Sequence, residues 1–124
     1  MHRKRGFTLI ELLVVLAIVA MLLSIVTPRY IHQADRAKEA ALRENLTTLR
    51  ISIDKYNADK GHYPTQLADL VQERYLRQLP MDPVTNQNNS WQPVLIDDGN
   101  NKVIYDVKSG ATGKGLDGSA YNSW

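Results

Sequence analysis

Glu11 is the residue whose position in this sequence most suggests chemistry. It is the only ionisable side chain in an apolar run from residue 7 to residue 27. As a helix this run would span about 32 Å, enough to cross the hydrocarbon core of a bilayer. A carboxylate inside such a span costs at least ~2.5 kcal/mol on insertion scales, so it normally has a partner or a function. A charged partner for Glu11 must therefore lie outside the run or be created by processing.

The segment before the apolar run holds three consecutive cations, Arg3-Lys4-Arg5, followed by Gly6. Cations at this end favour a cytoplasmic N-terminus, which places the rest of the chain across the membrane. Cleavage after Gly6 would leave Phe7 with an α-amino group that is largely protonated at neutral pH. We hypothesise that Glu11 pairs with this amine on a neighbouring subunit and so sets the register between subunits.

The order Lys4-Arg5-Gly6-Phe7-Thr8-Leu9-Ile10-Glu11 resembles the class III signal of type IV pilins and type II secretion pseudopilins. In that family a prepilin peptidase cuts between the glycine and the phenylalanine and then methylates the new amine. The resemblance implies that residues 1–6 are a leader peptide and that residues 7–27 form a transmembrane and assembly helix. It also implies that Phe7 is the methylated first residue of the mature chain and that Glu11 is the fifth.

Two other interpretations of this end are weaker. An ordinary signal peptide is cleaved after its apolar run, and residues 24–27 match such a cleavage site poorly. A simple single-pass anchor leaves Glu11 unexplained.

Composition limits the remaining possibilities. The sequence has 124 residues and no cysteine, which excludes disulfides, cysteine-based metal sites and thiol catalysis. The formal charge of +2 includes residues 3–5; removing these three from the 15 basic residues leaves 12 against 13 acidic ones, a net charge of −1. A nearly neutral mature chain gives no reason to expect nucleic-acid binding.

A second helical pattern follows the apolar run. Pro28 predicts a kink or a local loss of helix, because proline lacks a backbone N–H and clashes with the preceding turn. Residues 28–60 then show an amphipathic face formed by Leu42, Leu46, Leu49, Ile53 and Tyr56. We predict one kinked helix from residue 7 to about residue 59, ended by Gly61. A two-stranded coiled coil is the alternative, but two heptads are short, so packing onto the chain's own domain is favoured.

Residues 61–124 predict a small periplasmic globular domain. Thr65 is expected to cap a short helix with Leu67, Leu70 and Val71 turned inward. Two prolines three residues apart make residues 76–90 an ordered loop.

An antiparallel hairpin is predicted next, with strands at 91–96 and 102–107 joined by a turn at 97–101. On the second strand Val103, Tyr105 and Val107 are expected to alternate with Lys102, Ile104 and Asp106. Because Ile104 interrupts the polar set, both faces are expected to be partly covered.

This half of the sequence resembles the pseudopilin G family, the major pseudopilins of type II secretion. The resemblance is carried by Tyr63-Pro64-Thr65, Tyr75-Leu76, Leu79-Pro80, Asp82-Pro83 and Tyr105-Asp106-Val107-Lys108-Ser109-Gly110. The expected fold is therefore α+β and pilin-like, with a long kinked N-terminal helix packed on a small domain that contains a short helix and a β-hairpin.

The tail from Ser109 to Trp124 departs from that family, whose last loop typically supplies several acidic calcium ligands. Here the tail offers only Asp117, with Asn122, Ser109 and Asp106 nearby in the sequence. Calcium takes roughly six to eight oxygen ligands, usually including several carboxylates. Asp117 is thus a weak calcium candidate, and a simple Asp-Gly turn is the favoured interpretation. Tyr121 and Trp124 are expected to pin the tail to the hairpin and could replace an ion by apolar packing.

No catalytic constellation is visible. His2, His32 and His62 share no motif with a nucleophile or a second ligand, so we predict no enzyme activity and no cofactor.

The resemblance implies instead a subunit of a helical pseudopilus in the bacterial inner membrane and periplasm. Its partners would be further copies of itself, a prepilin peptidase, the inner-membrane assembly platform, minor pseudopilins and, before assembly, membrane lipid. A type IV pilus subunit for adhesion, motility or DNA uptake is one alternative, and a membrane-anchored monomeric binding protein is another.

Overall fold

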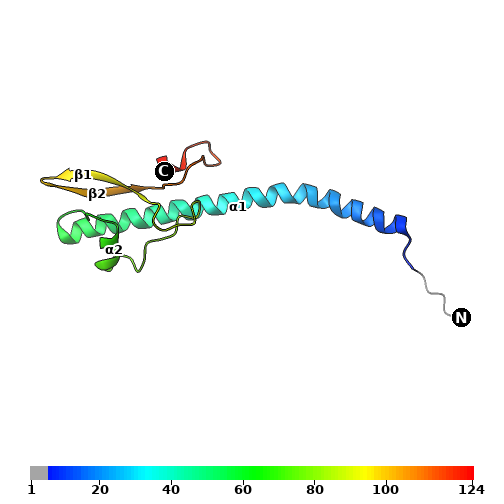
Figure 1. The fold of residues 1–124 in the computed structure, drawn as a ribbon, viewed down its shortest axis with the longest axis horizontal. Helices are drawn as coiled ribbons and strands as arrows, with labels where there is room; N and C mark the ends of the chain where they lie inside the picture. Colours follow the sequence, from blue (N-terminus) through cyan, green and yellow to red (C-terminus); the bar gives the residue numbers. More distant parts are fainter. Residues whose placement is uncertain (1–5) are drawn as a thin grey trace. The chain divides into compact units, whose positions relative to one another are not determined.

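The computed structural model describes residues 6–124, without the side chains at positions 27, 28 and 30. Its elements in chain order are the helix α1 (Leu9–Lys60), the helix α2 (Ala68–Gln72), the strands β1 (Gln92–Asp98) and β2 (Asn101–Lys108), and a 3-10 turn η1 (Tyr121–Ser123) (Figure 1). The chain divides into two compact units, one ending at Asp35 and one running from Arg36 to Trp124. The α+β pilin-like fold is confirmed.

The first unit contains the start of α1. The Thr8 hydroxyl oxygen lies 3.1 Å from the Glu11 backbone nitrogen and accepts its N–H, so Thr8 caps the helix. The helix runs through position 28 without a break. The local loss of helix predicted at Pro28 as the alternative to a kink is therefore wrong, whereas the kink stays a prediction.

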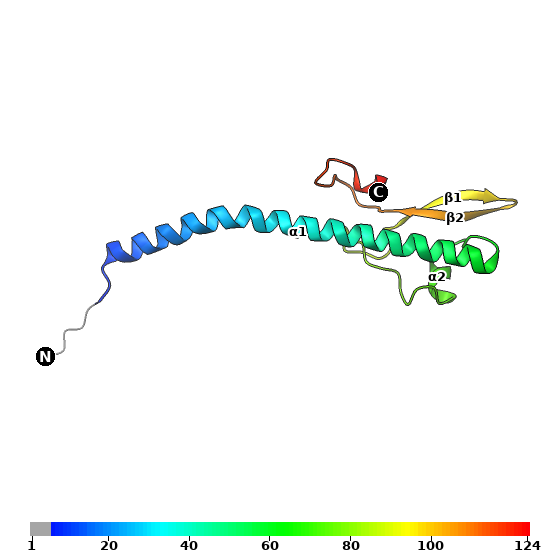
Figure 2. The same cartoon turned by 180° about the vertical axis from the view of Figure 1, so that it is seen from behind.

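The second unit is built on the amphipathic part of α1. The five predicted face residues are all buried, and they form one core with Leu70, Trp91, Ile104 and Val107. The hairpin covers one side of this part of α1, and α2 lies on the other side (Figures 1 and 2). The chain's own domain therefore covers the face, as predicted. Each fully buried large apolar side chain contributes about 1.5–3 kcal/mol.

The end of α1 is also as predicted. Gly61 adopts a φ of 80°, and its N–H donates to the Asn57 carbonyl at 2.9 Å. This is the left-handed glycine that commonly ends a helix.

The start of α2 differs from the prediction. Leu67, not Thr65, occupies the N-cap position, and no side chain caps the helix there. The Thr65 hydroxyl and the backbone N–H groups of Thr65 and Gln66 all donate to one oxygen of Asp69. A charged carboxylate is the stronger acceptor, so it takes the place that a capping hydroxyl would have. Leu70 is buried and Leu67 packs partly buried against the core, as predicted, whereas Val71 is half-buried and is not part of that core.

The loop between α2 and β1 is ordered around Asp82, which is completely buried. One Asp82 oxygen accepts the backbone N–H groups of Val84 at 2.9 Å and Thr85 at 3.3 Å. The other accepts the Ser109 hydroxyl at 2.5 Å. The loop is thereby tied to the start of the tail.

The hairpin is confirmed, with strands slightly longer than predicted, but its alternation is not. Val94 pairs with Asp106 and Leu95 pairs with Ile104, which leaves Tyr105 as an extra residue on β2. Such a bulge shifts every following side chain to the other face. Ile104 therefore joins Val107 in the core, whereas Tyr105 is 43% exposed.

Candidate functional site

The predicted processing site lies at the start of α1. Gly6, Phe7 and Thr8 are outside the helix and exposed, with Phe7 87% exposed. The cations at 3–5, and most of the predicted leader, lie outside the described residues. The roles predicted for Gly6 and Phe7 thus stay predictions. Both residues lie in a backbone segment that precedes the helix.

Thr8 is the residue that sequence reasoning missed at this site. Thr8 and Glu11 form the Ser/Thr-x-x-Glu pattern that marks a helix N-terminus, and that pattern could have revealed the cap. Thr8, the second residue after the predicted cleavage point, caps the helix, which begins at Leu9.

The Glu11 side chain is exposed. Across residues 6–124, no hydrogen bond or ion pair involves its carboxylate. The described part of the chain therefore leaves this carboxylate available to a group on another molecule.

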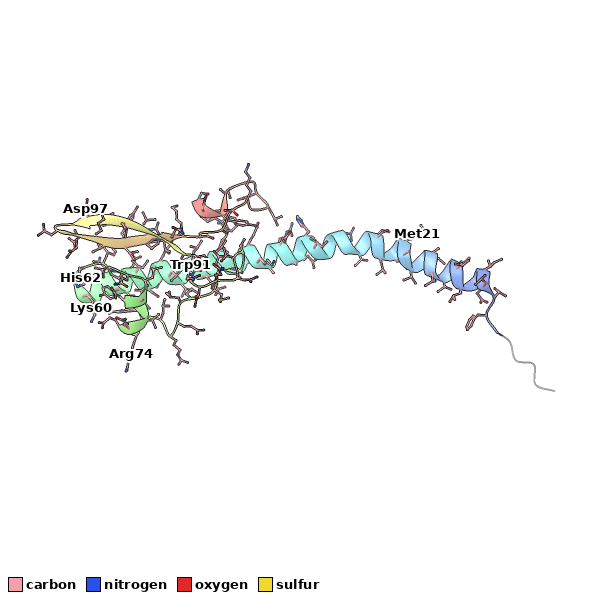
Figure 3. The ribbon with its side chains drawn as sticks, viewed as in Figure 1. Met21, Lys60, His62, Arg74, Trp91 and Asp97 are labelled. Atoms are coloured by element: carbon pink, nitrogen blue, oxygen red, sulfur yellow. The ribbon has the colours of Figure 1, made fainter. Side chains whose placement is uncertain are left out.

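The part of α1 that follows is apolar on all sides. Every side chain from residue 9 to residue 26 is exposed, and Figure 3 shows those of this stretch, Met21 among them, projecting around the helix. Within the described residues, α1 is the one helix long and apolar enough to cross a membrane by length and composition. These features fit single-pass membrane anchoring.

The weak calcium candidate lies in the tail. One Asp117 oxygen accepts the Ser119 N–H at 3.0 Å and the Ser119 hydroxyl at 2.6 Å. The other lies 3.7 Å from Arg43 Nη2. The hydrogen bonds from Ser119, assisted by the Arg43 charge, lower the pKa of Asp117 below its ordinary value.

Comparisons with known proteins agree with these features. Residues 1–27 match the family model of the prokaryotic N-terminal methylation motif. The chain is 32% identical to the type II secretion system core protein G of Escherichia coli K12, over 68% of this chain and 69% of that protein. It is 33% identical to the protein of that name from Klebsiella pneumoniae, over 67% of this chain and 71% of that protein. The chain belongs to the type II secretion system core protein G family.

The core protein G of Pseudomonas aeruginosa is a further relative, with 30% identity over 68% of this chain and 71% of that protein. No solved structure matches the chain. The core protein G relationship and the methylation motif support a pseudopilin role, and the relatives are structural components of a secretion system.

The side-chain oxygens in the tail of this core protein G chain do not form a set of ligands that fits a calcium ion. No group of three or more histidine, aspartate or glutamate side chains that could hold a metal is present among residues 6–124. Asp106, the other acid considered for such a site, instead accepts a hydrogen bond from Arg50 Nε at 2.8 Å. The two acids are thus each paired with an arginine, and they do not share a site.

Proposed function

We propose that this core protein G chain is a structural filament subunit, a pseudopilin, of a type II secretion system. A prepilin peptidase cleaves it between Gly6 and Phe7 and methylates the new Phe7 amine. The mature chain then assembles with copies of itself into a helical pseudopilus that aids protein export. The observation that carries the proposal is the exposed apolar part of α1, directly behind a junction that matches the methylation motif.

The geometry of the junction supports cleavage there. A peptidase binds its substrate with the backbone extended, so a scissile bond inside a helix would first have to unwind. The Thr8 cap places Gly6 and Phe7 before the first helical residue, where no unwinding is needed.

The apolar part of α1 supports assembly through the membrane. In the precursor, lipid covers this surface, with the N-terminus in the cytoplasm and the domain in the periplasm. In the filament, the helices of neighbouring subunits cover it. Lipid tails and helix faces are similarly apolar, so this transfer yields little hydrophobic energy by itself.

Register in the filament must then come from packing and polar pairing. The Glu11 carboxylate pairs with the methylated amine of a neighbouring Phe7, which relieves the cost of a charge in an apolar environment. The inner-membrane assembly platform and the minor pseudopilins would act on the same helix. The chain itself is a peptidase substrate and carries out no reaction.

A gene deletion with complementation tests the proposed function. We expect the deletion strain to retain its exported proteins in the periplasm, and the intact gene to restore their release. Twitching motility and DNA uptake should not change. A strain that exports normally but loses motility or DNA uptake would overturn the assignment in favour of a type IV pilus subunit.

A further inference from the structure

The tail from residue 109 to residue 124 is held against α1 by three charged side chains of that helix: Glu39, Arg43 and Arg50. We call this set of contacts the clasp, because it holds the tail onto α1.

Glu39 binds the middle of the tail. Its Oε1 atom accepts the backbone N–H of Leu116 at 2.6 Å and the Tyr121 hydroxyl at 3.2 Å. Hydrogen bonds to an ionised acceptor are shorter and stronger than those between neutral groups.

Arg43 binds two further points. Its guanidinium carbon lies 3.8 Å from the centroid of the Trp124 ring, a cation–π contact. Its Nη2 atom lies 3.7 Å from an Asp117 oxygen. The Arg43 side chain thus contacts both Asp117 and Trp124 of the tail.

Arg50 joins the tail to the hairpin. Its Nε atom donates to Asp106 at 2.8 Å, and its Nη2 atom donates to the Val107 carbonyl at 3.0 Å and to the main-chain oxygen of Trp124. The planar guanidinium can serve several acceptors at once, which a lysine ammonium does with less fixed geometry.

The tail oxygens face hydrogen-bond donors, which is the wrong arrangement for a cation. One oxygen of Glu39 and one oxygen of Asp117 each accept two N–H or O–H groups. The backbone carbonyls of Gly113 and Ser119 likewise accept backbone N–H groups. A calcium ion would have to displace these donors, whose positive ends point at the positions it needs.

The space between these groups is also filled. A Cβ atom at Gly115 would lie 2.5 Å from Trp124 Cζ2, 3.1 Å from the Glu39 oxygen and 3.2 Å from the Asp117 oxygen. The Trp124 ring is fixed in turn by its Nε1–H, which donates to the Ser119 hydroxyl oxygen at 2.6 Å.

We infer that this tail folds onto α1 independently of calcium, with the guanidinium groups of Arg43 and Arg50 supplying the positive charge that a bound ion supplies where a pseudopilin tail carries several acidic ligands. The inference concerns the folding of residues 36–124. It therefore stands or falls separately from the proposed filament function.

The test compares the full chain, purified in detergent, with excess calcium chloride and with excess EGTA. Thermal unfolding and the rate of proteolytic cleavage within the tail are measured in both. We expect the midpoint and the cleavage rate to be the same. If the chain bound calcium, a free calcium concentration one hundred times the Kd would raise the midpoint of thermal unfolding by at least about 10 °C. A calcium-dependent rise in midpoint, or faster cleavage in EGTA, would overturn the inference.

Arginine variants test the other half of the inference. We expect Arg50→Gln and Arg43→Gln to increase tail cleavage severalfold in EGTA, with the larger effect at Arg50, whose side chain is less exposed than that of Arg43. Arg36→Gln is the matched control, since no ion pair involves this exposed residue of α1 within the described part of the chain. A tail equally protected in all three variants would contradict the clasp. Where a variant does not fold, the calcium comparison on the unaltered chain still decides.

Discussion

At the scale of single residues, the start of α1 depends on two side chains with different functions. Glu11 was identified from the sequence alone, because a carboxylate in an apolar span is costly whatever surrounds it. Thr8 needed the structure, because its hydroxyl matters only through the helix end that it caps. We propose that Glu11 supplies a charge for assembly, whereas Thr8 sets where the helix begins.

Glu11→Ala should insert into the membrane at least as well as the unaltered chain, since it removes a penalty of at least ~2.5 kcal/mol. It should assemble poorly, because the neighbouring amine then has no partner. Membrane-fraction abundance and the yield of sheared filaments measure the two effects. Ser24→Ala is the matched control, because the Ser24 hydroxyl is satisfied within its own helix by the Met21 carbonyl at 2.7 Å. Normal filaments from Glu11→Ala would sink the register hypothesis.

Thr8→Val removes the capping oxygen but keeps the shape of the side chain. Loss of a cap costs about 1 kcal/mol, so the helix start should fray. Because a frayed helix start leaves more extended backbone around the junction, we expect faster cleavage after Gly6, by up to about fivefold, measured by pulse-chase. Thr8→Ser keeps a capping hydroxyl and should be cleaved at the normal rate. Equal rates for the two variants would show that the cap does not position the junction.

The buried acid Asp82 makes a separate prediction about the loop. Asp82→Ala would leave the N–H groups of Val84 and Thr85 and the Ser109 hydroxyl without their acceptor. We expect a loss of about 3 kcal/mol in the free energy of unfolding, measured by urea titration of the full chain. Asp82→Asn retains one acceptor and should lose less. An unchanged midpoint for Asp82→Ala would contradict the role assigned to this carboxylate.

At the scale of elements, sequence reasoning succeeded where a signal was local. The spacing from Leu42 to Tyr56 predicted the buried face of α1, Gly61 predicted its end, and turn residues predicted the hairpin. It failed where one particular partner decided the outcome. The bulge at Tyr105, set by the pairing with β1, put Ile104 rather than Tyr105 in the core. Asp69, only four residues from Thr65, replaced the predicted cap of α2.

The tail shows the same limit most clearly. Tyr121 and Trp124 were expected to pin it to the hairpin, but the Tyr121 hydroxyl donates to Glu39 and the Trp124 ring lies against the Arg43 guanidinium, both on α1. Those partners are about 80 residues away in the sequence, and no pattern of charges on a helix identifies which one meets a distant loop. The role predicted for Asp117 likewise depended on neighbours that only the fold brings together.

Gly115→Ala tests the packing of the tail as an element. The added methyl group would press on the Trp124 ring at 2.5 Å, so the ring or the loop must move. Overpacking of this kind costs about 1–3 kcal/mol, and we expect a lower thermal midpoint and faster tail cleavage. Lys114→Ala changes the exposed neighbouring position and should leave both unchanged. A Gly115→Ala chain as stable as the original would show that the tail has room there.

At the scale of the whole molecule, the chain combines two units with opposite solvent requirements. The unit ending at Asp35 exposes an apolar helix surface, whereas the unit from Arg36 buries a core of its own. The second unit can therefore stay folded in water whatever covers the apolar surface of the first. Under the proposed function, this division would let a small domain without disulfides belong to a membrane-anchored precursor and also to a filament.

The most direct test of this account is the intact mass and N-terminal sequence of the protein recovered from cell membranes. The account predicts the loss of residues 1–6 and the gain of one methyl group on the Phe7 amine. A chain that still begins at Met1, or one cut after residues 24–27, would contradict it. Glu11 would then have no processed amine to pair with, and the chain would be an anchored or secreted monomer.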